Sequence, residues 1–111
     1  MNRLPPSNMT LAARHVAKHL PGTPQMQKLL REEGKAHIFL DELTLNRVAQ
    51  EIFERGQFTG FVRDWERYGL RFSEPIGCRI DAEGNRLPLY YAEMKVKNGK
   101  YHIVPRTQPS F

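Results

Sequence analysis

The chain has 111 residues, a length that predicts one domain with one hydrophobic core. Hydrophobic residues make up 40% of it and charged residues 26%, which is typical of a soluble globular protein and excludes a disordered one. Seventeen Lys and Arg against twelve Asp and Glu give a formal net charge of +5, so we expect a polyanion such as RNA to be favoured as a partner.

Neither a membrane segment nor a secretion signal is expected. No apolar run in the chain approaches the roughly 20 residues that span a bilayer. The first ten residues, MNRLPPSNMT, lack the apolar stretch of a signal peptide. We therefore expect a cytoplasmic location and no membrane partner, or delivery into the cytoplasm of a target cell if the chain is a toxin domain.

The N-terminal third is predicted to form an arm and two helices. Residues 1–9 are rich in proline and polar residues, and we expect a flexible arm ahead of one globular α+β domain over residues 10–111. Thr10 is a suitable N-cap for a helix through LAARHVAKHL, which the Pro-Gly pair after Leu20 would end. A Thr-Pro pair then predicts the cap and first turn of a second helix, which closes at Gly34.

The most regular helical pattern lies in the middle of the chain. AHIFL, residues 36–40, is short and apolar, and is either a strand or a buried connection. Asp41 or Thr44 then caps a helix through ELTLNRVAQEIFERG, in which apolar residues recur at helical spacing. Gly56 is expected to end this helix.

Beyond this helix the apolar residues change to the period of two that is typical of strands. TGFVRDWERYGLRF fits no single element, and we place a turn in it, followed by a strand over residues 66–72. Further strands are predicted for IGCRID, LPLYYAEMKVK and YHIVPRT, with turns at AEGN and NGK. The expected class is α+β, with N-terminal helices packed on one face of an antiparallel β-meander of three to four strands.

The last two predicted strands form a hairpin around Asn98-Gly99, because both residues of this pair accept positive φ. A two-residue turn places Lys95 opposite His102, and side chains directly opposite share a face. A slip of one residue would expose the apolar face, which supports this register. The apolar face is expected to pack on the helices and consists of Ala92, Met94, Val96, Tyr101 and Ile103. The other face consists of Tyr91, Glu93, Lys95, Lys97, Lys100, His102, Val104 and Arg106.

Two interpretations of this second, polar face stay open. It is either the wet side of an ordinary antiparallel sheet or a chemical site on the uncovered surface of the hairpin. In favour of a site, Lys95 beside His102 would lower the pKa of the imidazole unless Glu93 offsets it. Tyr91 and Arg106 also suit stacking on a base and binding of a phosphate.

The remaining histidines and the one cysteine give no metal site. RHVAKH places His15 and His19 four residues apart on one predicted helix face, a spacing that can hold a metal ion, but the Glu of the zinc-protease pattern is missing. Cys78, the only cysteine, excludes multi-cysteine zinc sites and an internal disulfide, and it is interpreted as a small core residue. We expect no metal and no cofactor. A structural role and a general acid–base role both stay open for the histidine pair, and His37 is expected to be half-buried.

Cleavage of RNA without a metal needs a base for the 2′-hydroxyl proton, a cation beside the phosphate and an acid for the leaving oxygen. The RHxxxH of the first helix and the YHIVPR near the C-terminus, with helices followed by a meander, resemble the small metal-independent ribonuclease toxins. These form the barnase, EndoU, colicin and RelE-like group found in bacterial polymorphic toxins. The resemblance implies that a histidine of the helical part faces Arg, Lys, Tyr, Ser or Thr side chains of the sheet.

We therefore expect two sets of site residues. The catalytic candidates are His102, His15, His19, Lys95, Arg106 and Glu93. The candidates for nucleic-acid contacts are Tyr91, Lys97, Lys100 and Thr107.

Three functions follow, and whether the chain is an enzyme stays open. The first is a metal-independent endoribonuclease, a toxin module with a cognate immunity protein or antitoxin as partner. The second is a nucleic-acid-binding domain without turnover, in which Tyr91 and the cations of the same face contact bases and phosphates. The third is a protein-interaction module such as an antitoxin, an immunity protein or a phage accessory protein, in which Phe58, Phe61 and Trp65 are either core or an interaction patch.

Overall fold

The computed structural model describes residues 3–6 and 8–109, except for the side chain of Arg14. These residues form an α+β protein, as the sequence predicts. The helical elements are α1 (Ala13–Val16), the 3₁₀ turn η1 (Ala17–His19), α2 (Pro24–Glu33) and α3 (Glu42–Arg55). The strands are β1 (Thr10–Leu11), β2 (Lys35–Phe39), β3 (Gln57–Val62), β4 (Trp65–Arg71), β5 (Gly77–Asp81), β6 (Arg86–Leu89), β7 (Tyr91–Lys97) and β8 (Lys100–Arg106).

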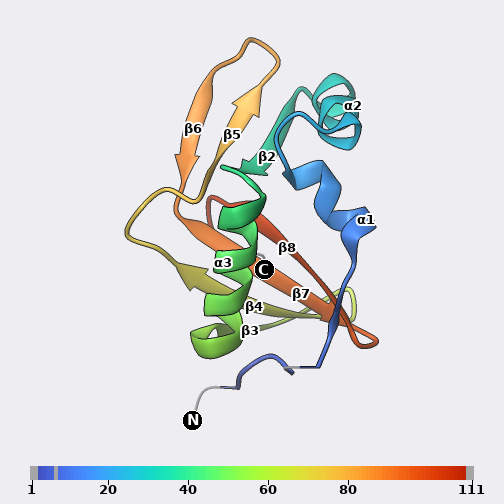
Figure 1. The fold of residues 1–111 in the computed structure, drawn as a ribbon, viewed down its shortest axis with the longest axis vertical. Coiled ribbons are helices and arrows are strands. Elements are labelled where there is room, and N and C mark those ends of the chain that lie inside the picture. Colours follow the sequence, from blue (N-terminus) through green and yellow to red (C-terminus); the bar gives the residue numbers. More distant parts are fainter. Residues whose placement is uncertain (1–2, 7, 110–111) are drawn as a thin grey trace.

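The strands form two sheets rather than one meander (Figure 1). The first sheet has the order β1-β8-β7-β4-β3, and the second has the order β2-β5-β6. After β4 the chain leaves the first sheet, adds β5 and β6 to β2, and returns as β7. The expected layout of helices on a single meander is therefore not confirmed, because the sequence pattern does not distinguish strands of one sheet from strands of the other.

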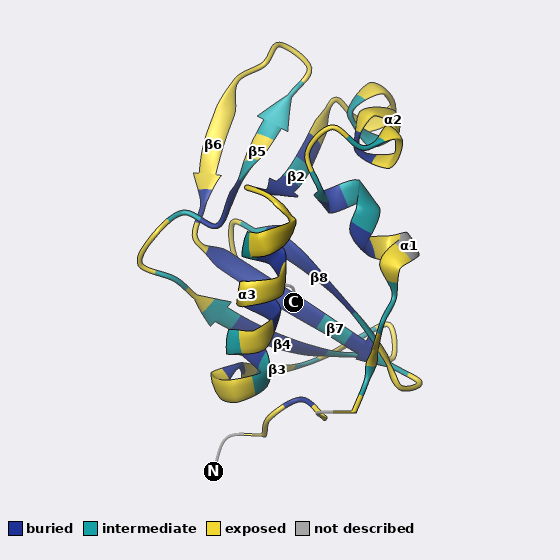
Figure 2. Ribbon diagram, viewed as in Figure 1, coloured by how far each residue is buried: buried dark blue, intermediate teal, exposed yellow. Residues whose placement is uncertain are grey.

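The main core lies between α3 and the first sheet. Asp41 caps α3 by accepting a hydrogen bond of 2.7 Å from the backbone N–H of Thr44. The helix buries Leu45, Val48, Ala49 and Ile52 in one cluster with the predicted apolar face of the hairpin. In Figure 2, β7 and β8 are accordingly buried along most of their length, whereas the outer face of α3 is exposed. The predicted helix and the predicted apolar face are both confirmed.

The second helix covers the second sheet. Thr23 caps α2 as predicted, since its Oγ1 accepts from the N–H of Met26 at 3.1 Å. Gly34 ends the helix with a φ of 75°, a conformation that glycine adopts without strain. Met26 packs with Ala36 and Ile38 of β2 in a smaller apolar cluster, to which Cys78 of β5 also contributes. The other side of β2 is thereby left to face the first sheet.

The predicted first helix is wrong in its N-terminal half. Thr10 and Leu11 instead pair in parallel with Lys100 and Tyr101 as a short strand at the edge of the first sheet. The N–H of Ala12 donates to the carbonyl of Tyr101 at 2.7 Å, so hydrogen bonds to β8 replace those of a first helical turn. What remains is one α-helical turn followed by a 3₁₀ turn.

Two further strand predictions need correction. The unassigned segment is the β3–β4 hairpin, whose turn residues Arg63 and Asp64 have φ values of 52° and 67°. Sequence reasoning missed β3 because neither residue is glycine, the usual sign of such a turn. The single strand predicted for LPLYYAEMKVK is also divided at Tyr90 into β6 and β7, which belong to different sheets.

Residues of the N-terminal arm also contact the domain. Arg3 lies 4.4 Å from the ring centroid of Phe58 and forms an ion pair with Glu66. Pro5 is buried. Residues 1, 2 and 7 of the predicted arm lie outside the described residues.

Candidate functional site

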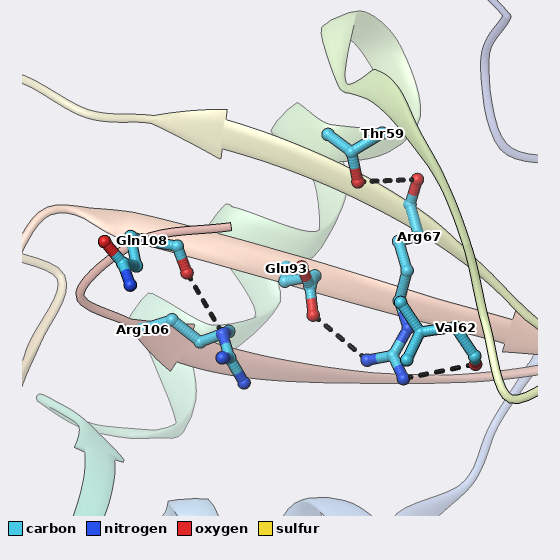
Figure 3. Close-up of polar contacts among 6 residues, drawn as sticks. All are labelled: Thr59, Val62, Arg67, Glu93, Arg106 and Gln108. Carbon is cyan, nitrogen blue, oxygen red and sulfur yellow. Dashed lines mark hydrogen bonds and ion pairs between the residues drawn. The ribbon is translucent and has the colours of Figure 1, made fainter. Parts of the chain in front are cut away.

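The polar face of the hairpin exists as predicted and continues onto β4. The register of β7 with β8 places Lys95 opposite His102 and Tyr91 opposite Arg106. On its other side β7 pairs with β4, so that Arg67 lies opposite Lys95. Figure 3 shows Arg67, Glu93 and Arg106 on the side of this sheet away from α3. The predicted register of the hairpin is confirmed.

Most of this face is covered by other elements. The prediction that the face is uncovered is therefore wrong for its centre. Glu93 is fully buried, and Tyr91 and His102 are only 6% and 7% exposed. The cover includes α1 and β2, which both lie against β8. The sequence signal was ambiguous here, because the alternation of β7 and β8 is the same whether the polar face meets water or other polar side chains.

His102 lies under two aromatic rings. The ring of His15 stacks on it with a centroid separation of 5.0 Å, and the ring of Trp65 meets it edge-on at 4.9 Å. Burial, followed by the charge of Lys95, lowers the pKa of His102 to about 3. Its buried Nδ1 has no hydrogen-bond partner among the described residues. His102 is thus held neutral, with one ring nitrogen that no described group satisfies.

The pKa of Lys95 is lowered in the same cluster. Burial, followed by the neighbouring charge of Arg67, lowers this pKa to about 8, while the charge of Glu93 opposes the change. Lys95 therefore remains mostly cationic at pH 7 but releases its proton about two units more readily than an exposed lysine. Groups with pKa values moved towards neutrality are common in functional sites.

Glu93 has a buried ion-pair partner that sequence reasoning missed. Arg67 donates from Nη1 to Glu93 Oε1 at 3.0 Å and from Nη2 to the carbonyl of Val62 at 3.4 Å (Figure 3). The side chains of Arg67 and Glu93 are 7% and 0% exposed. The available signal was the alternation of Trp65 and Arg67 in β4, which places both on the polar face.

The two histidines of RHVAKH do not share one face. His15 is exposed and stacks on His102, whereas His19 is buried and its Nδ1 lies 2.8 Å from the carbonyl oxygen of His37. A carbonyl only accepts, so Nδ1 carries the proton of a neutral ring. Burial accordingly lowers the pKa of His19 to about 4. Within residues 3–6 and 8–109, no group of three or more His, Cys, Asp or Glu side chains could hold a metal ion.

An open cleft borders the histidine cluster. It has a volume of about 600 Å³ and lies between β1, the start of α1 and the tip of the β7–β8 hairpin. Lys97 Nζ lies 5.8 Å from the ring centroid of Trp65, and Lys100 is exposed at the rim. The lining residues are Thr10, Leu11, Ala12, Ala13, His15, Trp65, Lys97, Asn98 and Lys100. Trp65 was not among the predicted site residues, although its place in the cleft wall makes it one of the accessible aromatic groups.

Three predicted site residues lie away from the cleft. Arg106 and Thr107 line a separate hollow at the other end of β8, together with side chains of the second sheet. Tyr91 is buried, and its hydroxyl occupies the space beside Gly69 where any larger residue would place its Cβ. The guanidinium carbon of Arg71 lies 5.3 Å from the Tyr91 ring centroid. The structure therefore brings His15, His102, Lys97 and Lys100 together, and separates Tyr91, Arg106 and Thr107 from them.

The chain belongs to a family whose model matches residues 7–110 and is described as a domain of unknown function, DUF6972. No curated protein and no solved structure matches the chain significantly. In the part of the chain that the structure describes, no helix is long and apolar enough to cross a membrane.

Proposed function

We propose that the protein is a metal-independent endoribonuclease that binds RNA in the cleft beside His15 and Trp65. The observation that carries the proposal is the pair of imidazoles, His15 and His102, stacked at 5.0 Å, of which His15 lies in the wall of a basic cleft and His102 is buried behind it. An exposed histidine, a buried neutral one and a lysine with a lowered pKa are the groups that acid–base cleavage of a phosphodiester uses.

The cleft also has the features of a binding site for single-stranded RNA. Trp65 offers a ring on which a base can stack, and the neighbouring cations Lys97 and Lys100 suit contacts to phosphates. In this arrangement His15 is the accessible imidazole. It takes the proton of the 2′-hydroxyl as that oxygen bonds to phosphorus, and the protonated ring then gives this proton to the 5′-oxygen as the bond between phosphorus and the 5′-oxygen breaks. His102 orients the His15 ring by stacking, and Lys95 adds positive charge behind both rings.

The arrangement of the first sheet supports the resemblance to the small ribonuclease toxins. There α3 packs on β3, β4, β7 and β8, which are successive antiparallel neighbours despite the excursion through β5 and β6. If the chain acts as a toxin in the cytoplasm of a target cell, a cognate immunity protein or antitoxin would inhibit it by covering the same cleft. Co-expression with such a partner should then abolish RNA cleavage.

The proposal is tested by incubating the purified protein with single-stranded RNA in the presence of a metal chelator. We expect cleavage, and we expect His15→Ala to slow it by about 10²–10⁴-fold, the usual contribution of a general acid or base. Because His15 is exposed, this variant should unfold at the temperature of the unmodified protein. Lys28→Gln, which removes a cation from the exposed side of α2, is the matched control and should cleave normally.

Binding without turnover is the second candidate function, favoured by Trp65 and the two lysines of the cleft. It predicts RNA affinity that falls with salt and that Trp65→Ala and Lys97→Gln weaken, whereas His15→Ala changes no reaction rate. RNA that remains intact but bound would establish this function and exclude the nuclease. If the protein neither binds nor cleaves RNA but co-purifies with another protein, the interaction module is favoured instead.

A further inference from the structure

A second basic hollow lies where the two sheets meet. It has a volume of about 210 Å³ and is lined by Lys35 and His37 of β2, Arg79 of β5, Val104 and Arg106 of β8, and Thr107. No described residue lines both this hollow and the cleft beside Trp65. Lys100 lines the cleft and Arg106 the hollow, so the two are separated by about 20 Å along β8.

The hollow follows from the alternation of β2. Ala36 and Ile38 point towards α2 in the second apolar cluster, so Lys35 and His37 point to the opposite side of the second sheet. There His37 lies directly across from Arg79, and β8 brings Arg106 against the same surface. Three cationic side chains from three strands therefore converge on one small space.

No carboxylate lines this space among the described residues. The nearest acidic residue by register is Asp81, which pairs with Lys35 across the β2–β5 ladder. Its carboxylate is already occupied in the β5–β6 turn, where Oδ1 accepts from the N–H groups of Glu83 and Asn85 at 2.9 Å each. Within residues 3–6 and 8–109, Lys35, Arg79 and Arg106 have no ion-pair partner. Like charges thus face one another here without an ion pair to any carboxylate of the described residues.

The donors in the hollow suit an oxyanion. Arg106 uses Nε for the carbonyl of Gln108 at 3.1 Å (Figure 3), which leaves both Nη groups available. The guanidinium of Arg79 and the hydroxyl of Thr107 add further donors. Burial, followed by the charges of Arg106, Arg79 and Lys35, lowers the pKa of His37 to about 4, as expected beside cations that lack a counterion.

The volume decides the size of the ligand. About 210 Å³ lies below the ~300–1,000 Å³ of pockets for drug-sized ligands. A phosphate group fits inside the hollow, whereas the remainder of a nucleotide would extend out of it. Guanidinium groups donate two parallel hydrogen bonds to phosphate as they do to carboxylate, and three cations without an ion pair match the higher charge of phosphate.

We propose that Lys35, His37, Arg79, Arg106 and Thr107 form a phosphate-binding site that is independent of the cleft. The ligand is a phosphate group, either free in solution or carried by a nucleic acid. The site does not depend on ribonuclease activity, so it stands or fails separately from the function proposed above.

The test is a titration of the isotope-labelled protein with inorganic phosphate, followed by NMR at constant ionic strength. We expect saturable shifts at Lys35, His37, Arg79 and Thr107, without shifts at Trp65. Arg79→Gln should weaken binding at least tenfold, whereas Lys28→Gln, with the same loss of charge on α2, should change it less than twofold. Both positions are exposed, so neither substitution should prevent folding.

A second arm identifies the source of the phosphate. Short RNA oligonucleotides with and without a 5′-phosphate are titrated in the same way, and their affinities are compared with that of inorganic phosphate from the same NMR shifts. Tighter binding of the phosphorylated oligonucleotide assigns the site to a nucleic-acid terminus, equal binding of both oligonucleotides assigns it to internal phosphates, and binding of inorganic phosphate alone assigns it to the free ion. The proposal would be overturned if no saturable shifts occur up to a phosphate concentration of about ten times a Kd of ~1 mM. It would also be overturned if Arg79→Gln binds phosphate as tightly as the unmodified protein.

A charge-state readout provides an independent check. A bound anion favours the protonated form of His37, so phosphate should raise the pKa of this imidazole, which faces Lys35, Arg79 and Arg106. The pKa is measured from the ring resonances with and without phosphate. No rise at saturating phosphate would place the anion elsewhere.

Discussion

Replacing Glu93 by Gln removes the negative charge from a buried ion pair and leaves the guanidinium of Arg67 without its partner. The two side chains are 0% and 7% exposed and are joined at 3.0 Å, so neither charge can be solvated by water. Removing one member of such a pair costs about 3–5 kcal/mol. The whole free energy of unfolding of a domain is typically 5–15 kcal/mol, so Glu93→Gln should be severely destabilised.

The assays are urea and thermal unfolding, both followed by the fluorescence of Trp65, the only tryptophan in the chain. A loss of 3–5 kcal/mol corresponds to a fall in Tm of about 12–20 °C for a domain of this size, at about 4 °C per kcal/mol. The double variant Arg67→Met with Glu93→Gln removes the unpaired charge and should recover part of this loss.

The matched control is Glu51→Gln on α3, which breaks a pair with Arg55 of similar length, 2.8 Å, at the surface. An exposed helical pair of this kind contributes about 0.3–0.5 kcal/mol. If the free energy of unfolding of Glu93→Gln lies within 1 kcal/mol of that of the unmodified protein but the variant no longer cleaves RNA, Glu93 has no such structural role and belongs to the catalytic site.

Three further predictions concern single residues. His19 has a pKa of about 4 in the folded protein against about 6.5 when unfolded, so the unfolded state binds more protons between these values. The contribution of His19 to stability should therefore be complete above pH 6.5 and fall by about 3 kcal/mol as the pH drops to 4. His37 and His102, whose pKa values are also lowered, add to this loss, so urea unfolding of His19→Gln should show a weaker but not absent dependence over this range. In Gly69→Ala the new methyl group would occupy the position of the Tyr91 hydroxyl, so we expect a loss of about 1–3 kcal/mol. Calorimetry should show a smaller loss when the change is made together with Tyr91→Leu, which removes the hydroxyl and the ring beside Gly69, and equal losses in both backgrounds would exclude this clash. Lys95 loses its charge near pH 8, so RNA affinity measured by fluorescence anisotropy should fall between pH 7 and 9, and this fall should be absent from Lys95→Met.

Local signals accounted for the elements whose ends are marked by single residues. The caps at Thr23 and Asp41, the closing Gly34 and the turn at Asn98-Gly99 all occur where the sequence predicts them. These features depend on backbone conformations and hydrogen bonds within a few residues, so the local sequence is sufficient to specify them.

Elements that depend on contacts with distant segments could not be predicted in this way. The segment after Thr10 has helix-forming residues, yet hydrogen bonds to β8 make its beginning a strand. The turn at Arg63-Asp64 carries no glycine, so β3 could not be separated from β4. In each case a partner far along the chain overrides or replaces the local preference.

The same division holds for the candidate site. The side chains that share the polar face follow from the sequence, because strand alternation and a two-residue turn fix the neighbours of His102. Three contacts follow from the packing of distant segments instead: α1 places His15 on His102, Arg67 pairs with Glu93, and β2 and β5 bring further cations beside Arg106. Exposure, pKa and charge pairing depend on the segments that cover the face, and local sequence patterns do not specify those segments.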